Sequence, residues 1–109
     1  METSIQNGKF AELKIAEYNP LLASKLKWVN SAIFLSNCLY HHKIRRLEKD
    51  EWMELTINNV YNETGLNRWK QAGAVKRLKD LELIETKLAG MPSTRRFKIN
   101  FELLEQNYL

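Results

Sequence analysis

Three side chains in this sequence have a spacing suited to metal binding or to nucleophilic catalysis. Cys38, His41 and His42 would fall on one side of a helix, three and four residues apart. The chain has one cysteine and two histidines in total, so no further residue of either type can complete a tetrahedral metal site. A cysteine–histidine pair also needs an orienting third group and an oxyanion hole, which neighbouring turns of one helix do not supply. We therefore expect a core cysteine beside helix-end histidines, and no metal site, no cofactor and no catalysis.

The second chemistry that the sequence offers is the binding of a polyanion by clustered cations. Between Arg68 and Lys98 there are nine Lys and Arg residues and three acidic residues, a net charge of +6. Residues 1–67 have equal numbers of each sign, and residues 99–109 add two negative charges. The whole excess of the chain, +4 at pH 7, therefore lies in one segment, as expected for a surface that contacts phosphates.

Capping and turn residues predict two helices in and just before this basic segment. Thr56 is placed to cap a first helix, which ends at Gly65 because glycine adopts the left-handed conformation most easily. Asn67 then caps a second helix that runs to about residue 80. The first helix is expected to bury Ile57, Val60 and Tyr61, and the second to bury Gln71, Ala74, Val75, Leu78 and Leu81. Gln71 is the polar member of this second stripe, at a position that is normally apolar.

Alternating apolar and polar residues after the second helix predict a β-hairpin. The apolar face would comprise Ile84, Thr86, Leu88, Phe97 and Ile99. Gly90-Met91-Pro92 would form its tip, and residues 52–55 suit a short edge strand that pairs with it. Residues 101–109 suit a terminal helix. This order predicts an α+β, mainly α, winged helix-turn-helix, with a three-helix core, a small antiparallel hairpin as the wing and extra terminal helices.

The N-terminal half would complete the helical core of a single domain. We expect residues 1–12 to form a flexible arm and residues 13–109 to form the winged-helix domain. Asn19-Pro20 would open one helix. Ser31 would cap the next, which is apolar on most sides and ends near Lys43.

In this arrangement the second helix would enter the major groove of duplex DNA and the hairpin would clamp the flanking backbone or minor groove. Arg68 and Lys70 could reach guanine edges or phosphates, and Trp69 could contact a thymine methyl group. The recognition helix would span residues 67–80 and the wing residues 87–98. The residues expected to bind DNA are Thr56, Asn67, Arg68, Trp69, Lys70, Lys76, Arg77, Lys79, Lys87, Ser93, Thr94, Arg95, Arg96 and Lys98.

Several segments between residues 19 and 101 are similar to a known family. They are Asn19-Pro20-Leu21-Leu22-Ala23, Ala32-Ile33-Phe34-Leu35-Ser36 with Leu39-Tyr40, Thr64-Gly65-Leu66-Asn67-Arg68, the segment from Arg77 to Glu85, and Phe97-Lys98-Ile99-Asn100. In these residues the chain resembles the N-terminal winged-helix domain of phage replisome organisers and related plasmid replication initiators. The resemblance implies origin binding as a dimer or larger assembly. In the family a second domain recruits the helicase machinery, and this chain has no room for one, so we expect a free-standing binder or a fragment.

The bulk properties agree with an intracellular DNA-binding protein. A chain of 109 residues that is 44% hydrophobic suits one core, and its single cysteine excludes an internal disulfide and favours a reducing cytoplasm. No apolar run approaches 18 residues, so no membrane partner is expected. The expected partner is double-stranded DNA, in phage- or plasmid-type replication initiation or in transcription regulation. The N-terminal arm and the apolar C-terminal stretch also permit a homodimer, and no small-molecule substrate is evident.

A second function class fits the same residues. A winged helix can serve as a protein-interaction module, and the basic face would then dock an acidic partner with Trp69 and Tyr108 as exposed anchors. DNA binding would weaken steeply with salt and persist on unrelated duplexes, whereas protein docking would show neither property.

Overall fold

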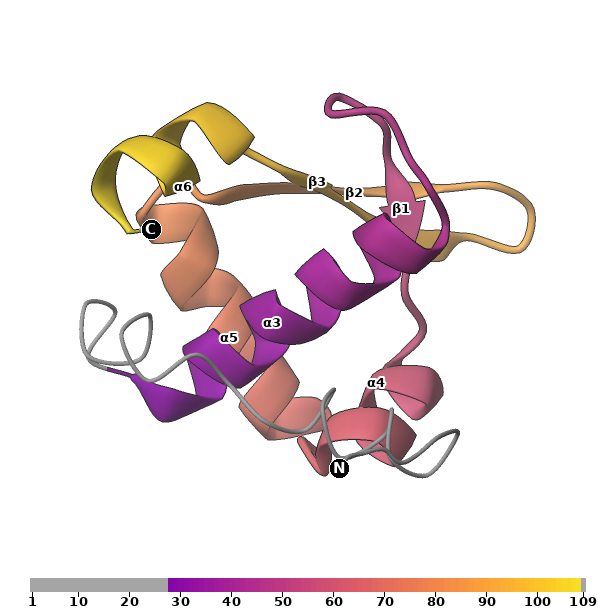
Figure 1. Ribbon diagram of the computed structural model, residues 1–109. Coiled ribbons are helices and arrows are strands. Elements are labelled where there is room, and N and C mark those ends of the chain that lie inside the picture. The colour runs from indigo at the N-terminus through magenta and orange to yellow at the C-terminus, as the bar shows by residue number, and fades with distance from the viewer. Residues whose placement is uncertain (1–27, 109) are drawn as a thin grey trace, which may run out of the picture.

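The computed structural model describes residues 28–108, which form four helices and a three-stranded antiparallel sheet (Figure 1). The helices are α3 (Val29–Ile44), α4 (Ile57–Thr64), α5 (Arg68–Asp80) and α6 (Phe101–Asn107), and the strands are β1 (Met53–Glu54), β2 (Ile84–Ala89) and β3 (Thr94–Ile99). The predicted α+β class, mainly helical, is confirmed for these residues. The expected arm of residues 1–12 and the helix expected at Asn19-Pro20 lie outside them.

The α4–α5 pair forms where the local signals placed it. The Thr56 hydroxyl accepts a hydrogen bond of 3.1 Å from the Asn59 backbone N–H, which caps α4. Gly65 ends α4 with a φ of 80°, in the left-handed region. The Asn67 side chain then accepts a bond of 2.9 Å from the Lys70 backbone N–H and caps α5. All three predicted positions are confirmed, because each depends on residues within four positions of it.

The start of α3 differs from the prediction. The helix begins at Val29, after Trp28, and the Ala32 backbone N–H already donates to the Trp28 carbonyl at 3.1 Å. The prediction that Ser31 caps this helix is therefore wrong, since Ser31 lies within the first turn and is fully buried. The helix ends at Ile44, close to the expected position.

The two helices bury their apolar stripes to different degrees. In α5, Gln71, Ala74 and Leu78 are buried, and Val75 and Leu81 are half-buried, as the periodicity predicted. In α4, Val60 is buried and Ile57 is half-buried, but Tyr61 is 52% exposed. The expectation for Tyr61 is wrong, because it follows the buried Val60 by one residue and is turned about 100° from the packed side of a short helix.

The sheet has the strand order β1-β3-β2, and α3, α4 and α5 lie on one side of it (Figure 1). Met53 of β1 pairs with Phe97 of β3, which confirms the predicted edge strand. Phe97 faces the helices and meets Phe34 of α3 edge to face, with ring centres 5.4 Å apart. Leu88 belongs to the same face, yet it is 72% exposed and lies outside the buried core.

The last helix packs on the same core. The Asn100 side chain accepts a hydrogen bond of 3.1 Å from the Leu103 backbone N–H and so caps α6. Leu104 is fully buried, so the predicted terminal helix is confirmed and covers one end of the described core. The helices within residues 28–108 lack the combination of length and hydropathy needed to span a membrane.

Candidate nucleic-acid interface

The first turn of α5 presents its side chains to solvent. Arg68, Trp69 and Lys70 are all exposed, and 80% of Trp69 is accessible. One turn later Ala72 and Gly73 are exposed, and apart from the neighbouring backbone of α5 no described atom lies within 4 Å of the place where a Cβ on Gly73 would stand. Small residues flanked by cations leave room for a close approach to the helix backbone.

The second half of α5 carries its cations in different settings. Lys76 lies 3.2 Å from Asp80 in an exposed ion pair one turn apart, which stabilises the helix only slightly. Lys79 is exposed. Arg77 is half-buried, and its guanidinium carbon lies 5.5 Å from the ring centre of Trp28, on which it stacks.

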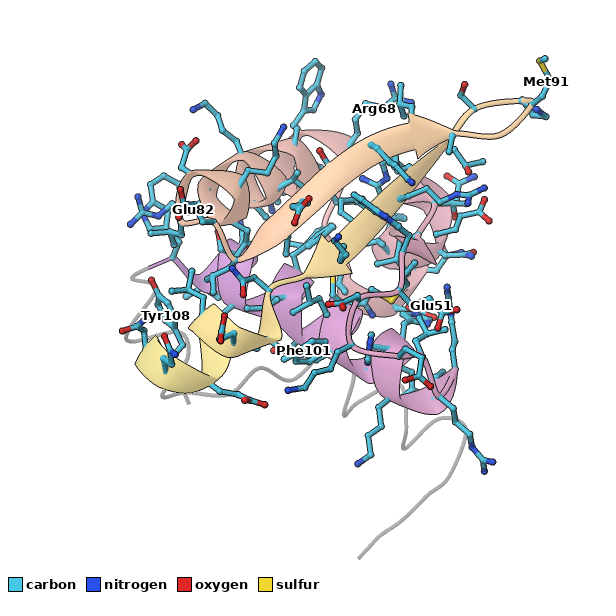
Figure 2. The ribbon with its side chains drawn as sticks, turned by 90° about the horizontal axis from the view of Figure 1, so that it is seen from above. Glu51, Arg68, Glu82, Met91, Phe101 and Tyr108 are labelled. Carbon is cyan, nitrogen blue, oxygen red and sulfur yellow. The ribbon has the colours of Figure 1, made fainter. Side chains whose placement is uncertain are left out.

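A groove of about 650 Å³ separates α5 from β2. Its walls are Arg68, Ala72, Val75, Lys76, Lys79 and Asp80 of α5 and Thr86, Lys87 and Leu88 of β2, and its floor includes Ile57, Arg95 and Phe97. Figure 2 shows Arg68 beside the end of β2, and Met91 at the far tip of the hairpin. The helix and the hairpin are thus adjacent, as the sequence predicted.

Arg95 does not lie where the sequence analysis expected it. Its Nε donates to the Leu55 carbonyl at 2.9 Å, and its Nη2 donates to Gln71 Oε1 at 2.9 Å. Its guanidinium carbon is 5.1 Å from the ring centre of Phe97. Burial lowers the pKa of this guanidinium, with a smaller opposing effect from Cys38. Arg95 is therefore a cation between β3 and the helices, because strand alternation turns residues 95, 97 and 99 inward.

Gln71 is the partner that holds Arg95 and the α4–α5 turn together. It is fully buried, and its Nε2 donates to the Leu66 carbonyl at 2.7 Å and to the Ile57 carbonyl at 3.0 Å. The two side chains join the start of α4, the turn, α5 and β3. Sequence reasoning missed this positioning role, and the available signal was the polar Gln71 in an otherwise apolar stripe.

The remaining hairpin cations lie on the opposite face of the sheet. Lys87 Nζ is 4.2 Å and Lys98 Nζ is 5.1 Å from the ring centre of Trp52, and Lys98 is also 3.9 Å from Glu85. Arg96 Nε donates weakly to the Thr94 hydroxyl at 3.3 Å. Of these cations only Lys87 also belongs to the walls of the groove, and Arg96 and Lys98 are not part of its lining.

The small polar residues expected at the interface serve local structure. The Thr56 side chain caps α4, and the Asn67 side chain caps α5. The Thr94 hydroxyl donates to the Ala89 carbonyl at 3.2 Å, across the base of the hairpin turn. Ser93 lies exposed in that turn, with a long contact of 3.5 Å to the Gly90 carbonyl.

Cys38, His41 and His42 each face a different environment. Cys38 is fully buried, and burial raises the pKa of its thiol to about 12 against smaller lowering effects of Arg95 and Arg45. His41 Nε2 is 2.6 Å from Glu63 Oε1, and His42 Nε2 donates to the Glu48 carbonyl at 2.8 Å. Within the described part of the chain, no three His, Cys, Asp or Glu residues are grouped so that they could hold a metal ion.

Comparison with known proteins gives no assignment for this chain. No family model matches it, and neither a curated protein nor a solved structure does. The function must therefore be inferred from the residues and their geometry.

Proposed function

We propose that this chain is a winged helix-turn-helix protein that binds duplex DNA without catalysing a reaction. The observation that carries the proposal is the first turn of α5, where Arg68, Trp69 and Lys70 are exposed together beside a projecting hairpin. In this reading α5 is the recognition helix and the β2–β3 hairpin is the wing.

The dimensions of α5 suit the major groove. An α-helix with its side chains is about 10–12 Å in diameter, which matches the width of about 12 Å of the major groove. Arg68 can donate two hydrogen bonds to the acceptors of a guanine edge, and Trp69 offers an apolar face to a thymine methyl group. Gly73 is exposed and has no side chain, so the middle of α5 can approach the DNA closely while the side chains of its first turn reach the bases.

Phosphate contacts would come from both elements. Lys70, Lys76 and Lys79 flank the exposed side of α5, and Lys87 and Arg96 lie on the hairpin. Arg95 is left out of this set, because two of its guanidinium nitrogens are already bonded to protein acceptors. About five cations in contact with phosphates would give a slope near −4 to −5 for the logarithm of affinity against the logarithm of salt concentration.

The resemblance to phage replisome organisers and plasmid replication initiators supports a role in replication initiation or transcription regulation, in the cytoplasm. A homodimer also belongs to this proposal. Sedimentation of the full chain at high micromolar concentration tests it, and a monomer there would exclude a stable dimer.

The decisive experiment is a titration of a labelled random-sequence duplex, followed by fluorescence anisotropy over a series of salt concentrations. The proposal predicts a steep negative salt dependence. On this duplex Lys70→Ala and Arg96→Ala should weaken binding, whereas Lys43→Ala, a charge change at the C-terminal end of α3, should not. Arg68→Ala should weaken binding mainly on a preferred sequence.

A protein-interaction module is the second candidate, because a tryptophan that is 80% exposed is a typical interface anchor. Folded protein with no affinity for duplex DNA, or with affinity that does not change with salt, would overturn the proposal and favour this candidate.

A further inference from the structure

The groove between α5 and β2 combines an apolar lining with a cationic rim. Val75 and Ala72 of α5 face Leu88 of β2 across it, and Phe97 lies at its base. Arg68, Lys76 and Lys79 stand along the α5 side of the same groove. DNA phosphates bound at this groove would pair with these cations but would leave the apolar lining exposed to water.

Leu88 is the side chain that makes this lining unusual. It is 72% exposed, although it belongs to the inner face of the sheet and is paired in register with Arg95. Leu88 lines the groove together with Ala72 and Val75, and apolar side chains gathered at a concave surface are typical of protein-binding sites.

The edge of β2 is open beside the groove. In the strand order β1-β3-β2, β2 pairs only with β3 among the described residues, so its other edge carries unpaired backbone groups. An extended segment lying along this edge would pair its backbone with β2 and direct every second side chain into the groove.

We propose that this groove binds an extended acidic segment of a partner protein. One apolar side chain of the segment inserts between Val75 and Leu88, and its carboxylates pair with Arg68, Lys76 and Lys79. Charge complementarity selects the occupant, because the rim has these three cations and the single carboxylate Asp80, which is already paired with Lys76.

The groove proposal does not require the protein to bind DNA, and the groove is a different surface from Trp69. Arg68 takes part in both the groove and the proposed recognition surface. A bound acidic segment would therefore compete with duplex DNA, and this regulatory consequence alone rests on the proposed function.

The test uses the full chain and three labelled peptides of about ten residues. The first alternates glutamate and leucine, the second replaces its glutamates with lysine, and the third consists of glutamate alone. Fluorescence anisotropy should detect binding of the first peptide, at least about tenfold weaker binding of the third and none of the second. Equal affinity for the first and third peptides would overturn the proposal, because the surface would then be a nonspecific anion site.

Two matched variants locate the site. Leu88→Ser should weaken binding of the alternating peptide about tenfold, because it removes an apolar side chain that the bound peptide would cover. Met91→Ser removes an apolar side chain that is 99% exposed at the tip of the same hairpin, and it should change the affinity less than about twofold. Equal effects of the two variants would overturn the assignment of the groove.

The same variants separate this proposal from the proposed function. Leu88→Ser should leave the affinity for a random duplex within about twofold of the parent, since phosphate contacts dominate that affinity. Duplex binding without peptide binding overturns the groove proposal alone. Peptide binding without duplex binding overturns DNA binding alone.

Discussion

The hydrogen bond between Gln71 and Arg95 offers the sharpest test of the structure, because it joins α5 to β3. The proposed perturbation is a double-mutant cycle with Gln71→Ala, Arg95→Ala and the double variant. Gln71→Ala removes the acceptor of Arg95 Nη2 and the donor to two backbone carbonyls, those of Ile57 and Leu66. A buried polar group left without a partner costs about 1–3 kcal/mol. Water would satisfy some of the three groups that lose their partner, so we expect Gln71→Ala to lower the free energy of unfolding by about 3 kcal/mol.

The coupling energy is the quantity that isolates the bond. Both single variants break the Gln71–Arg95 contact, so the double variant should cost less than the sum of the two. A hydrogen bond to a charged group is worth about 1.5–3 kcal/mol, and partial exposure of Arg95 brings the expected coupling to about 1–2 kcal/mol. Arg96 is the matched control, because it is the next residue of β3 and hydrogen-bonds to Thr94 instead. Its coupling to Gln71 should stay below about 0.5 kcal/mol.

The assay is urea unfolding followed by tryptophan fluorescence and by far-ultraviolet circular dichroism. Coincident transitions would justify a two-state treatment of each variant. A coupling between Gln71 and Arg95 no larger than that between Gln71 and Arg96 would refute the reasoning. The same variants also address DNA binding, because Arg96→Ala should reduce the salt slope by about one and Arg95→Ala should leave it unchanged.

Three further outcomes follow from single residues. Glu82, which follows α5, has a φ of 63° in the left-handed region, so Glu82→Gly should raise the free energy of unfolding by about 1 kcal/mol. Gly65 has a φ of 80°, so Gly65→Ala should lower the free energy of unfolding by about 1 kcal/mol, and urea unfolding measures both changes. Burial raises the pKa of the Cys38 thiol from 9.0 to about 12, so above pH 9 the unfolded chain loses this proton first and binds fewer protons than the folded chain. The free energy of unfolding should then fall by about 1 kcal/mol between pH 9 and pH 10, with a limiting slope of about 1.4 kcal/mol per pH unit. Urea titrations at pH 8, 9 and 10 should show this contribution in the parent and not in Cys38→Ala. Trp69→Ala should change stability by less than about 0.5 kcal/mol while it weakens duplex binding, and a large loss of stability would show that the indole packs on the fold.

Local sequence signals predicted the α4–α5 pair well. The caps at Thr56 and Asn67 and the left-handed Gly65 each depend on hydrogen bonds or dihedral angles within a few residues. The alternation of the hairpin strands was similarly local, and it placed β2 and β3 within one or two residues. Nothing outside these segments was needed to predict the elements.

The wrong predictions concern residues whose surroundings depend on contacts with segments that are distant in the sequence. Ser31 has the chemistry of a cap, but the α3 helix starts earlier and packs it into the interior. Tyr61 follows an apolar pattern, and whether such a residue is buried depends on which element packs against it. Arg95 is bonded to Leu55, 40 residues away, and periodicity carries no information about such a partner.

The neighbouring arginines of β3 show why a cluster of basic residues does not define a phosphate-binding surface. Arg95 and Arg96 contribute equally to the net charge of the segment, yet strand alternation sends them to opposite faces of the sheet. On the inner face a guanidinium meets Gln71 and the Leu55 carbonyl, and releasing it to bind a phosphate would leave both without a donor. On the outer face the Arg96 guanidinium makes, within residues 28–108, one weak hydrogen bond to Thr94 at 3.3 Å, so a phosphate can replace that bond at little cost. Net charge alone therefore does not identify the cations of a phosphate-binding surface, because a cation paired inside the fold has to give up its partners before it can bind a phosphate.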